Sequence, residues 1–260
     1  MITASFSIHN LEFFLLILAR VSALIYAAPF FNTKGVPGKV KIGLAFFLSI
    51  LVATQVDYYD LNYNTVLGYS VMVAKETIAG LALGFGANIA MYTLSFAGHI
   101  IDVDIGFSMV QLFDPLTNQE SSAFGSFYTY LVMLVMLLSN MHYYVISAVV
   151  DSFELIPLGM ATYHSEYMYN TVVQFASQYF LIAFRIILPV FGASLLLNII
   201  LGILAKSAPQ MNMFVIGMQL KILIGLAVLL VTVVCIPLIT DMVYGGMQDM
   251  VKSVLKVMTP

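Results

Sequence analysis

The sequence predicts an all-α membrane protein with about six long, partly kinked helices arranged as hairpins. Hydrophobic residues make up 61% of the 260 residues and charged residues only 9%, whereas soluble domains carry about 25% charged residues. The apolar residues also run on without the alternation that marks the strands of an outer-membrane barrel. Composition and pattern therefore agree on a polytopic helical protein, and the chain has no basic face of the kind that binds nucleic acid.

Six apolar segments follow one another along the chain, and each is an expected helix: 11–31, 40–56, 66–98, 123–150, 171–205 and 213–244. A helix needs about 20 residues to cross a bilayer core of about 30 Å. The second segment is therefore short for a span, and the third, fifth and sixth are longer than a span requires. Pro189 and Pro237 lie inside the last two segments and predict kinks there, because proline lacks a backbone N–H and clashes with the preceding turn.

The distribution of lysines conflicts with six simple spans. Lys34, Lys39 and Lys41 follow the first segment, which predicts a cytoplasmic loop, since short cytoplasmic loops are rich in Lys and Arg. Lys252 and Lys256 come five segments later, and a count of crossings places them on the opposite side. Either one segment is a hairpin or a re-entrant element, or the protein does not sit in the bilayer as an ordinary bundle.

Six charged side chains inside the apolar segments are candidates for buried or interchain ion pairs: Glu12, Arg20, Lys75, Glu76, Arg185 and Lys221. A charge at mid-bilayer costs about 2.5–3.5 kcal/mol on insertion scales and is normally paired or faces a cavity. Neighbours in sequence do not face each other on a helix, so the partners must come from other segments or other chains. We favour structural pairing over a proton relay, because a relay needs several deep acids and Glu76 is nearly alone.

The stretch from Gly98 to Ser122 differs from the rest of the chain and is expected to be a functional loop. It contains four acids, no Lys or Arg and an apolar patch between residues 107 and 113, and Asp114-Pro115 then breaks the chain direction. Long loops in compact domains are usually functional or disordered, and these large apolar side chains do not suit a solvated linker. We expect the segment to close a passage. The candidate residues are Gly106, Phe107, Ser108, Met109, Val110, Gln111, Leu112, Phe113, Asp114 and Pro115.

The sequence contains no pattern that predicts catalysis, a metal site or a cofactor. The four histidines lack the spacing of metal ligands, and Cys235 is the single cysteine. Phosphate-binding glycine loops, GxSxG and HExxH are absent from the sequence. An enzyme is therefore not expected.

Several motifs resemble the FliR family of flagellar type III export-gate components, whose injectisome homologues form the SctT family. One is the run from Gly98 to Asp102, continued at Gly106–Met109 and ending at Asp114-Pro115. Another is Ala208-Pro-Gln-Met-Asn-Met-Phe-Val-Ile-Gly217 followed by Lys221. Arg20 with the Ala-Pro-Phe-Phe run at 28–31, and Ser152-Phe153 with Pro157-Leu158-Gly159, also fit. The matches lie in the same order over nearly the whole chain.

The resemblance implies a structural role in a closed gate that FliP and FliQ build together with one FliR copy. Residues 1–170 would be FliP-like, and residues 171–260 would form a FliQ-like helical hairpin. The loop 106–122 would plug the lumen above a gasket of FliP methionines. The resemblance also implies contact with FlhB, with the flagellar basal body and with unfolded export substrates, and a place among the lipids of the bacterial inner membrane.

Three alternatives remain open at this point. An injectisome SctT protein would have nearly the same sequence features. A secondary transporter would use broken helices at mid-membrane and would show an internal repeat, of which the two halves of the sequence give no convincing sign. A pure assembly scaffold would leave the apolar patch at residues 107–113 without a purpose.

Overall fold

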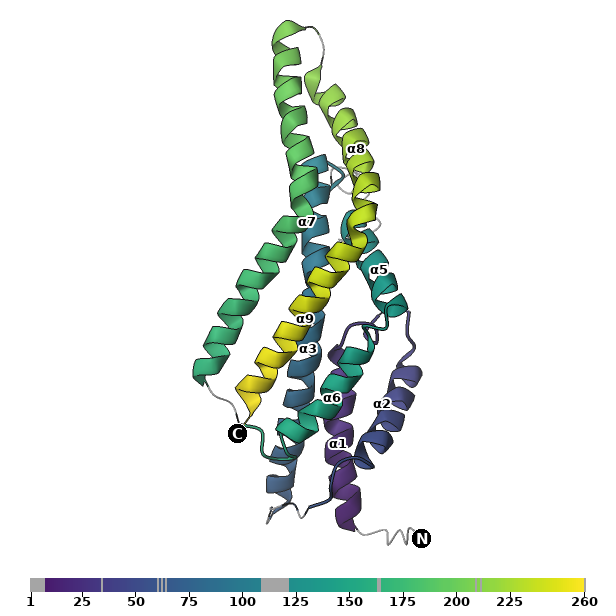
Figure 1. Cartoon of the computed structure of the whole chain (residues 1–260), viewed down its shortest axis with the longest axis vertical. Coiled ribbons are helices and arrows are strands. Elements are labelled where there is room, and N and C mark those ends of the chain that lie inside the picture. Colours follow the sequence, from purple (N-terminus) through teal and green to yellow (C-terminus); the bar gives the residue numbers. More distant parts are fainter. Residues whose placement is uncertain are drawn as a thin grey trace. The chain divides into compact units, whose positions relative to one another are not determined.

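The computed structural model of the chain describes residues 8–33, 35–59, 61, 63, 65–108, 122–162, 165–208, 210 and 212–259. Every regular element in these residues is a helix (Figure 1), which confirms the predicted all-α class. In chain order the elements are α1 (Ile8–Ala27), α2 (Gly38–Ala53), α3 (Val66–Ile105), α5 (Ala123–Leu138), α6 (Tyr143–Leu155), α7 (Ser165–Ser207), α8 (Met213–Thr232), the 3₁₀ turn η2 (Val233–Cys235) and α9 (Ile236–Met258).

Helix α3 begins where the sequence predicts, but it ends seven residues later than expected, at Ile105. Residues 98–105 were expected to belong to a loop and instead form its last two turns. Gly98 does not end the helix but allows α3 to pack closely against α5. A Cβ at this position would lie 2.0 Å from the backbone nitrogen of Gly125 in α5. Gly106 directly follows the helix, and its positive φ of 86° is the left-handed conformation that commonly closes a helix.

The fourth and sixth predicted segments each consist of two helices. The fourth is interrupted between α5 and α6 at residues 139–142, where Asn140 has a positive φ of 58°, a conformation that asparagine tolerates better than most residues. The sixth changes to a 3₁₀ turn at Val233–Cys235 before α9 begins. Pro237 is the second residue of α9, where a missing N–H costs no helical hydrogen bond. Pro189, by contrast, lies inside α7, and the helix is not interrupted there.

Four helical stretches in the described residues are long and apolar enough to cross a membrane: His9–Ala27, Val66–Ile105, Tyr167–Ser207 and Val215–Met258. The α5–α6 pair adds a fifth if it counts as one span, while the 16 residues of α2 fall short of the usual length. With five spans, four crossings separate the lysine-rich loop after α1 from the lysines near the end of α9. On that count both fall on the same side, whereas a count of four spans, without the α5–α6 pair, places them on opposite sides.

The chain packs as two units, the first formed by residues 1–89, 140–175 and 246–260 and the second by residues 90–139 and 176–245. In the first unit α1 packs against α2 and lies very close to α3. A Cβ on Gly80 would lie 2.1 Å from the carbonyl oxygen of Arg20, and one on Gly84 would lie 2.7 Å from that of Leu24. These two glycines, one helical turn apart, therefore allow the backbones of α1 and α3 to touch.

In the second unit the last turns of α3 contact α5, α7 and α8. Gly98 lies against Gly125 of α5, and Gly225 of α8 leaves room for Ile105, whose side chain a Cβ at 225 would meet at 2.3 Å. Phe96 packs edge-on against Phe180 of α7, with ring centroids 5.7 Å apart. Small residues on α3, α5 and α8 thus bring these helices close together around the start of the 106–122 segment.

The α1–α3 contact yields a stability prediction. Replacing Gly80 with alanine forces α1 away from α3, because the new Cβ would overlap a backbone carbonyl. We expect the free energy of unfolding to fall by about 1–3 kcal/mol, the usual cost of overpacking. Gly43 in α2 is the matched control, since a Cβ there meets nothing within 4 Å and alanine favours a helix by up to about 1 kcal/mol. The measurement is helical circular dichroism during denaturation in mild detergent, and equal stability of the two variants would contradict the prediction.

Candidate functional site

The first candidate site is a buried ion pair between α1 and α3. The side chains of Arg20 and Glu76 are both 0% exposed, and Arg20 Nε donates a hydrogen bond of 2.6 Å to Glu76 Oε2. The remaining guanidinium nitrogens reach the end of α6. Nη1 donates to the carbonyl oxygen of Ser152 at 2.9 Å and to its hydroxyl at 3.3 Å, and Nη2 donates to the carbonyl oxygen of Ile156 at 3.0 Å.

The other side of the ion pair is closed by a turn and by an aromatic ring. Glu76 Oε1 accepts a hydrogen bond of 2.8 Å from the backbone nitrogen of Gly159, which has a positive φ of 77° and so suits glycine. The Phe153 ring lies 4.3 Å from Arg20 Cζ, within the range of a cation–π contact. Arg20 and Glu76 therefore join α1, α3, α6 and the turn after α6 within one unit.

This network favours the structural reading of the buried charges. The sequence left open whether the partners of these charges lie in another segment or another chain, and for Arg20 and Glu76 the structure places them in the same chain. Both carboxylate oxygens of Glu76 accept a hydrogen bond within the chain. A buried pair contributes little net stability compared with apolar packing, yet removing one partner is costly, because the other charge is left uncompensated.

The remaining charged candidates are less buried. Glu12 accepts hydrogen bonds from the hydroxyl of Tyr63, between α2 and α3, and from His9 Nδ1 at 3.2 Å. The bond to Glu12 raises the pKa of Tyr63 to about 12. Lys75 and Lys221 are half-buried on α3 and α8, and the exposed Arg185 on α7 lies 3.8 Å from the sulfur of Met242.

The second candidate site is the base of the 106–122 segment. Gly106, Phe107 and Ser108 are described, whereas Met109, Val110, Gln111, Leu112, Phe113, Asp114 and Pro115 lie outside the described residues. The backbone nitrogen of Gly106 donates a hydrogen bond of 3.1 Å to the carbonyl oxygen of Val103. Phe107 packs edge-on against Phe124 in the first turn of α5, with ring centroids 6.2 Å apart.

Asp102 fixes the two ends of this segment together. Its side chain is buried, Oδ2 accepts a hydrogen bond of 2.8 Å from the backbone nitrogen of Ala123, and Oδ1 accepts one of 3.2 Å from that of Phe124. Ser122, the N-cap of α5, accepts a third from Gly125. The first amides of a helix lack partners within the helix and carry partial positive charge. A carboxylate from the last turns of α3 therefore caps α5 from outside.

Asp104 makes a separate contact within the same unit. It accepts a hydrogen bond from the hydroxyl of Ser194 in α7, and Ser194 is itself buried. Two of the four acids that marked the stretch in the sequence are thus used for helix contacts. In the described residues no group of three or more His, Cys, Asp or Glu side chains could hold a metal ion.

Sequence reasoning missed the residues that complete both sites. Ser152 and Gly159 belonged to a matched motif but received no role, although the Pro157-Leu158-Gly159 run indicates a tight turn. Ser122 had the signal of an N-cap, a serine directly before an apolar run. The pairing of Arg20 with Glu76, 56 residues away, has no local signal.

Comparison with known proteins identifies the class. Residues 11–248 match the family model described as bacterial export proteins, family 1. The chain is 30% identical over 244 residues to the flagellar biosynthetic protein FliR of Bacillus subtilis (strain 168), covering 93% of this chain and 94% of that protein. It is 31% identical over 212 residues to the FliR of Escherichia coli (strain K12), covering 82% and 80%, and 28% identical over 234 residues to that of Aquifex aeolicus (strain VF5), covering 90% and 88%. The chain belongs to the FliR family of bacterial export proteins.

The ion pair yields the next prediction. Replacing Arg20 with methionine leaves the Glu76 carboxylate buried without its partner, so we expect the free energy of unfolding to fall by about 3–5 kcal/mol. The double variant R20M/E76Q should lose less than the sum of the two single variants, because it carries no uncompensated charge. Asp151, exposed on α6, is the control, and D151N should change stability by less than about 0.5 kcal/mol. Denaturation in mild detergent measures all four, and an R20M variant as stable as D151N would sink the prediction.

Asp102 yields a local prediction. The D102A variant removes the acceptor of two amides in the first turn of α5, and loss of a helix cap costs about 0.5–2 kcal/mol. Amide hydrogen exchange at Ala123 and Phe124 should become about two- to thirtyfold faster, since local opening controls exchange. The D241A variant, which removes an exposed acid on α9, should leave these rates unchanged. Unchanged protection in D102A would contradict the assigned cap.

Proposed function

We propose that this chain is a structural subunit of the gate in a bacterial type III protein-export apparatus, with residues 106–122 as its plug. Membership of an export-protein family supports the first part. The relatives with flagellar names favour a flagellar system over an injectisome. The chain would act as a conduit for unfolded subunits and would carry out no chemical step.

The observation that carries the plug proposal is the anchor at Asp102. The segment leaves α3 at Gly106 and returns at Ser122, and Asp102 bonds directly to the first turn of α5. Its two ends are therefore held at one place. A loop tethered in this way can fill a passage, and the apolar side chains at 107–113 suit a constriction that must exclude water and ions.

The exposed apolar surface supports an assembly with other membrane proteins. In the most apolar parts of Tyr167–Ser207 and Val215–Met258 only 28% and 22% of the residues are buried within the chain. Side chains such as Phe184 and Leu230 are 63% and 72% exposed. Such surfaces need cover from lipid or protein. We propose FliP and FliQ as the principal partners, with FlhB at the periphery, in the inner membrane within the flagellar basal body.

Two further expectations belong to this proposal. Residues 1–170 would resemble a FliP subunit, and residues 171–260 would form a FliQ-like hairpin. Arg185 and Lys221, which lie on α7 and α8 of that hairpin, would pair with acidic groups of neighbouring subunits. The exposure of Arg185 supports such a contact, because a guanidinium at an apolar surface favours a carboxylate partner.

The plug is tested by removing its apolar side chains between residues 109 and 121 while keeping its anchor. Replacing residues 109–121 with thirteen glycines and serines leaves Asp102, Gly106 and Ser122 in place. We expect the export complex to assemble and the membrane to leak small solutes, because polar, flexible residues cannot keep a passage dry. Uptake of a small, normally excluded dye by cells or proteoliposomes is the measurement, with assembly checked by native gel.

The matched control retains Met109, Val110, Leu112 and Phe113 and replaces the other residues of 109–121 with glycine and serine. This variant should remain sealed, since the apolar side chains are still present. An assembled complex whose permeability stays at the native level in the first variant would overturn the plug proposal. A leak of equal size in both variants would also do so, because it would separate the seal from the apolar side chains.

A further inference from the structure

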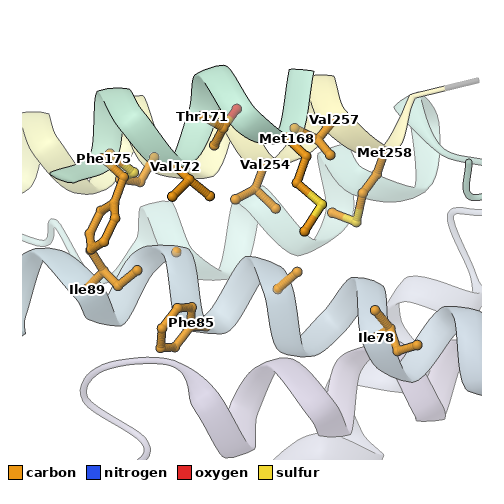
Figure 2. Close-up of a pocket in the computed structure, with 13 residues that line it drawn as sticks. Ile78, Phe85, Ile89, Met168, Thr171, Val172, Phe175, Val254, Val257 and Met258 are labelled. Atoms are coloured by element: carbon orange, nitrogen blue, oxygen red, sulfur yellow. The ribbon is translucent and has the colours of Figure 1, made fainter. Parts of the chain in front are cut away.

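The first unit contains an apolar cavity that the proposed gate function does not use. It has a volume of about 480 Å³ and lies between α3, α7 and α9 (Figure 2). Among the described residues that line it, Thr171 alone has a polar side chain. Volumes of about 300–1,000 Å³ are typical of sites for small molecules, so the cavity is large enough for part of a ligand.

The cavity opens to the outside of the chain, because several of its lining side chains are exposed. Among the lining residues, Ile78 and Phe85 of α3 are 51% and 56% exposed, and Met168 and Val172 of α7 are 55% each. Figure 2 shows Val172 and Met168 pointing toward α3 from one side, with Phe85 and Ile78 on the other. Gly86 also lines the cavity and lets α9 approach α3 closely, because a Cβ at this position would lie 3.2 Å from Val254. The result is a slot with apolar walls and an open mouth.

A polar cavity of about 400 Å³ lies beside the apolar one, against the same two helices, α7 and α9. Thr171 lines both cavities. In Figure 2 its hydroxyl oxygen points away from the apolar side chains. Thr171 thus lies between the apolar cavity and the polar cavity.

The polar cavity carries a net positive charge. Lys252 and Lys256 line it one helical turn apart on α9, together with the single acid Asp249. Like charges at this spacing repel each other, so an anion between them would relieve the repulsion. Gln174 lines the same cavity and carries an amide that can donate to phosphate oxygens.

We propose that these two cavities together form a binding site for one anionic phospholipid, with an acyl chain between α3, α7 and α9 and its phosphate at Lys252 and Lys256. Charge complementarity decides the occupant: an apolar partner helix would fill the slot but leave two lysines against the single acid Asp249. A diacyl lipid with an anionic headgroup satisfies both compartments. Basic residues close to membrane helices recognise anionic lipids in this way. The inference goes beyond the export function and does not depend on the plug.

The test uses phospholipids that carry a photoactivatable diazirine in an acyl chain. The full-length chain, in the complex in which it is purified from membranes, is placed in nanodiscs with a trace of labelled phosphatidylglycerol or labelled phosphatidylcholine. After photolysis, peptide mass spectrometry measures the labelled fraction at residues 78–89, 168–175 and 250–258. We expect the anionic lipid to label these residues more strongly than the zwitterionic lipid.

Two variants separate the headgroup from the chain. K252Q/K256Q should lower labelling by phosphatidylglycerol about fivefold for each lysine, the effect of one basic residue near an anionic membrane surface, and should leave phosphatidylcholine labelling unchanged. K39Q/K41Q, which removes two charges on α2, is the matched control and should change neither. Val172→Phe should lower labelling by both lipids, since it fills the slot from an exposed position. Helical circular dichroism confirms that each variant is folded.

Three results would overturn the proposal. The first is native labelling that avoids these three stretches with both lipids. The second is phosphatidylglycerol labelling that K252Q/K256Q leaves at the native level. The third is a cross-link from a photoreactive side chain at position 172 to another polypeptide in place of lipid, which would make the slot a protein interface.

Discussion

The buried contact between Arg20 and Glu76 is the constraint on which the first unit depends. It draws a residue from α1, one from α3 and the turn after α6 into a single closed network. Apolar side chains alone would allow these helices to rotate or slide, because apolar contacts have no preferred direction and different apolar faces of a helix pack almost equally well. A guanidinium with fixed donor directions accepts few arrangements. The glycines at 80 and 84 serve the same end, since they bring α1 close enough to α3 for the carboxylate to be reached.

The second unit uses a carboxylate differently, with the backbone of another helix as its partner. Asp102 bonds to the amides that begin α5, so the end of one helix and the start of the next are fixed to each other. This contact joins the two ends of the 106–122 segment through the helices that flank it.

The helices were predictable from the sequence, but several of their ends and most of the charge partners were not. Long apolar runs set the positions of α1, α3, α5, α7 and α8. The end of α3 was misplaced because Gly98 signals a boundary locally, while its tertiary role is close packing against Gly125. The interruption after α5 had a local signal, the polar Ser139-Asn140 pair, that was outweighed by the apolar residues on both sides. Partner choice for Arg20 depends on a residue 56 positions away, and no periodicity carries that information.

The interruption at residues 139–142 has a consequence for biosynthesis. Helix α5 has 16 residues and α6 has 13, so neither half alone has the about 20 apolar residues that the insertion machinery recognises readily as a transmembrane segment. During synthesis the pair would be poorly retained in the lipid until neighbouring helices cover it. Stable integration of this part of the chain is therefore expected to come late, after α7 to α9 have left the ribosome.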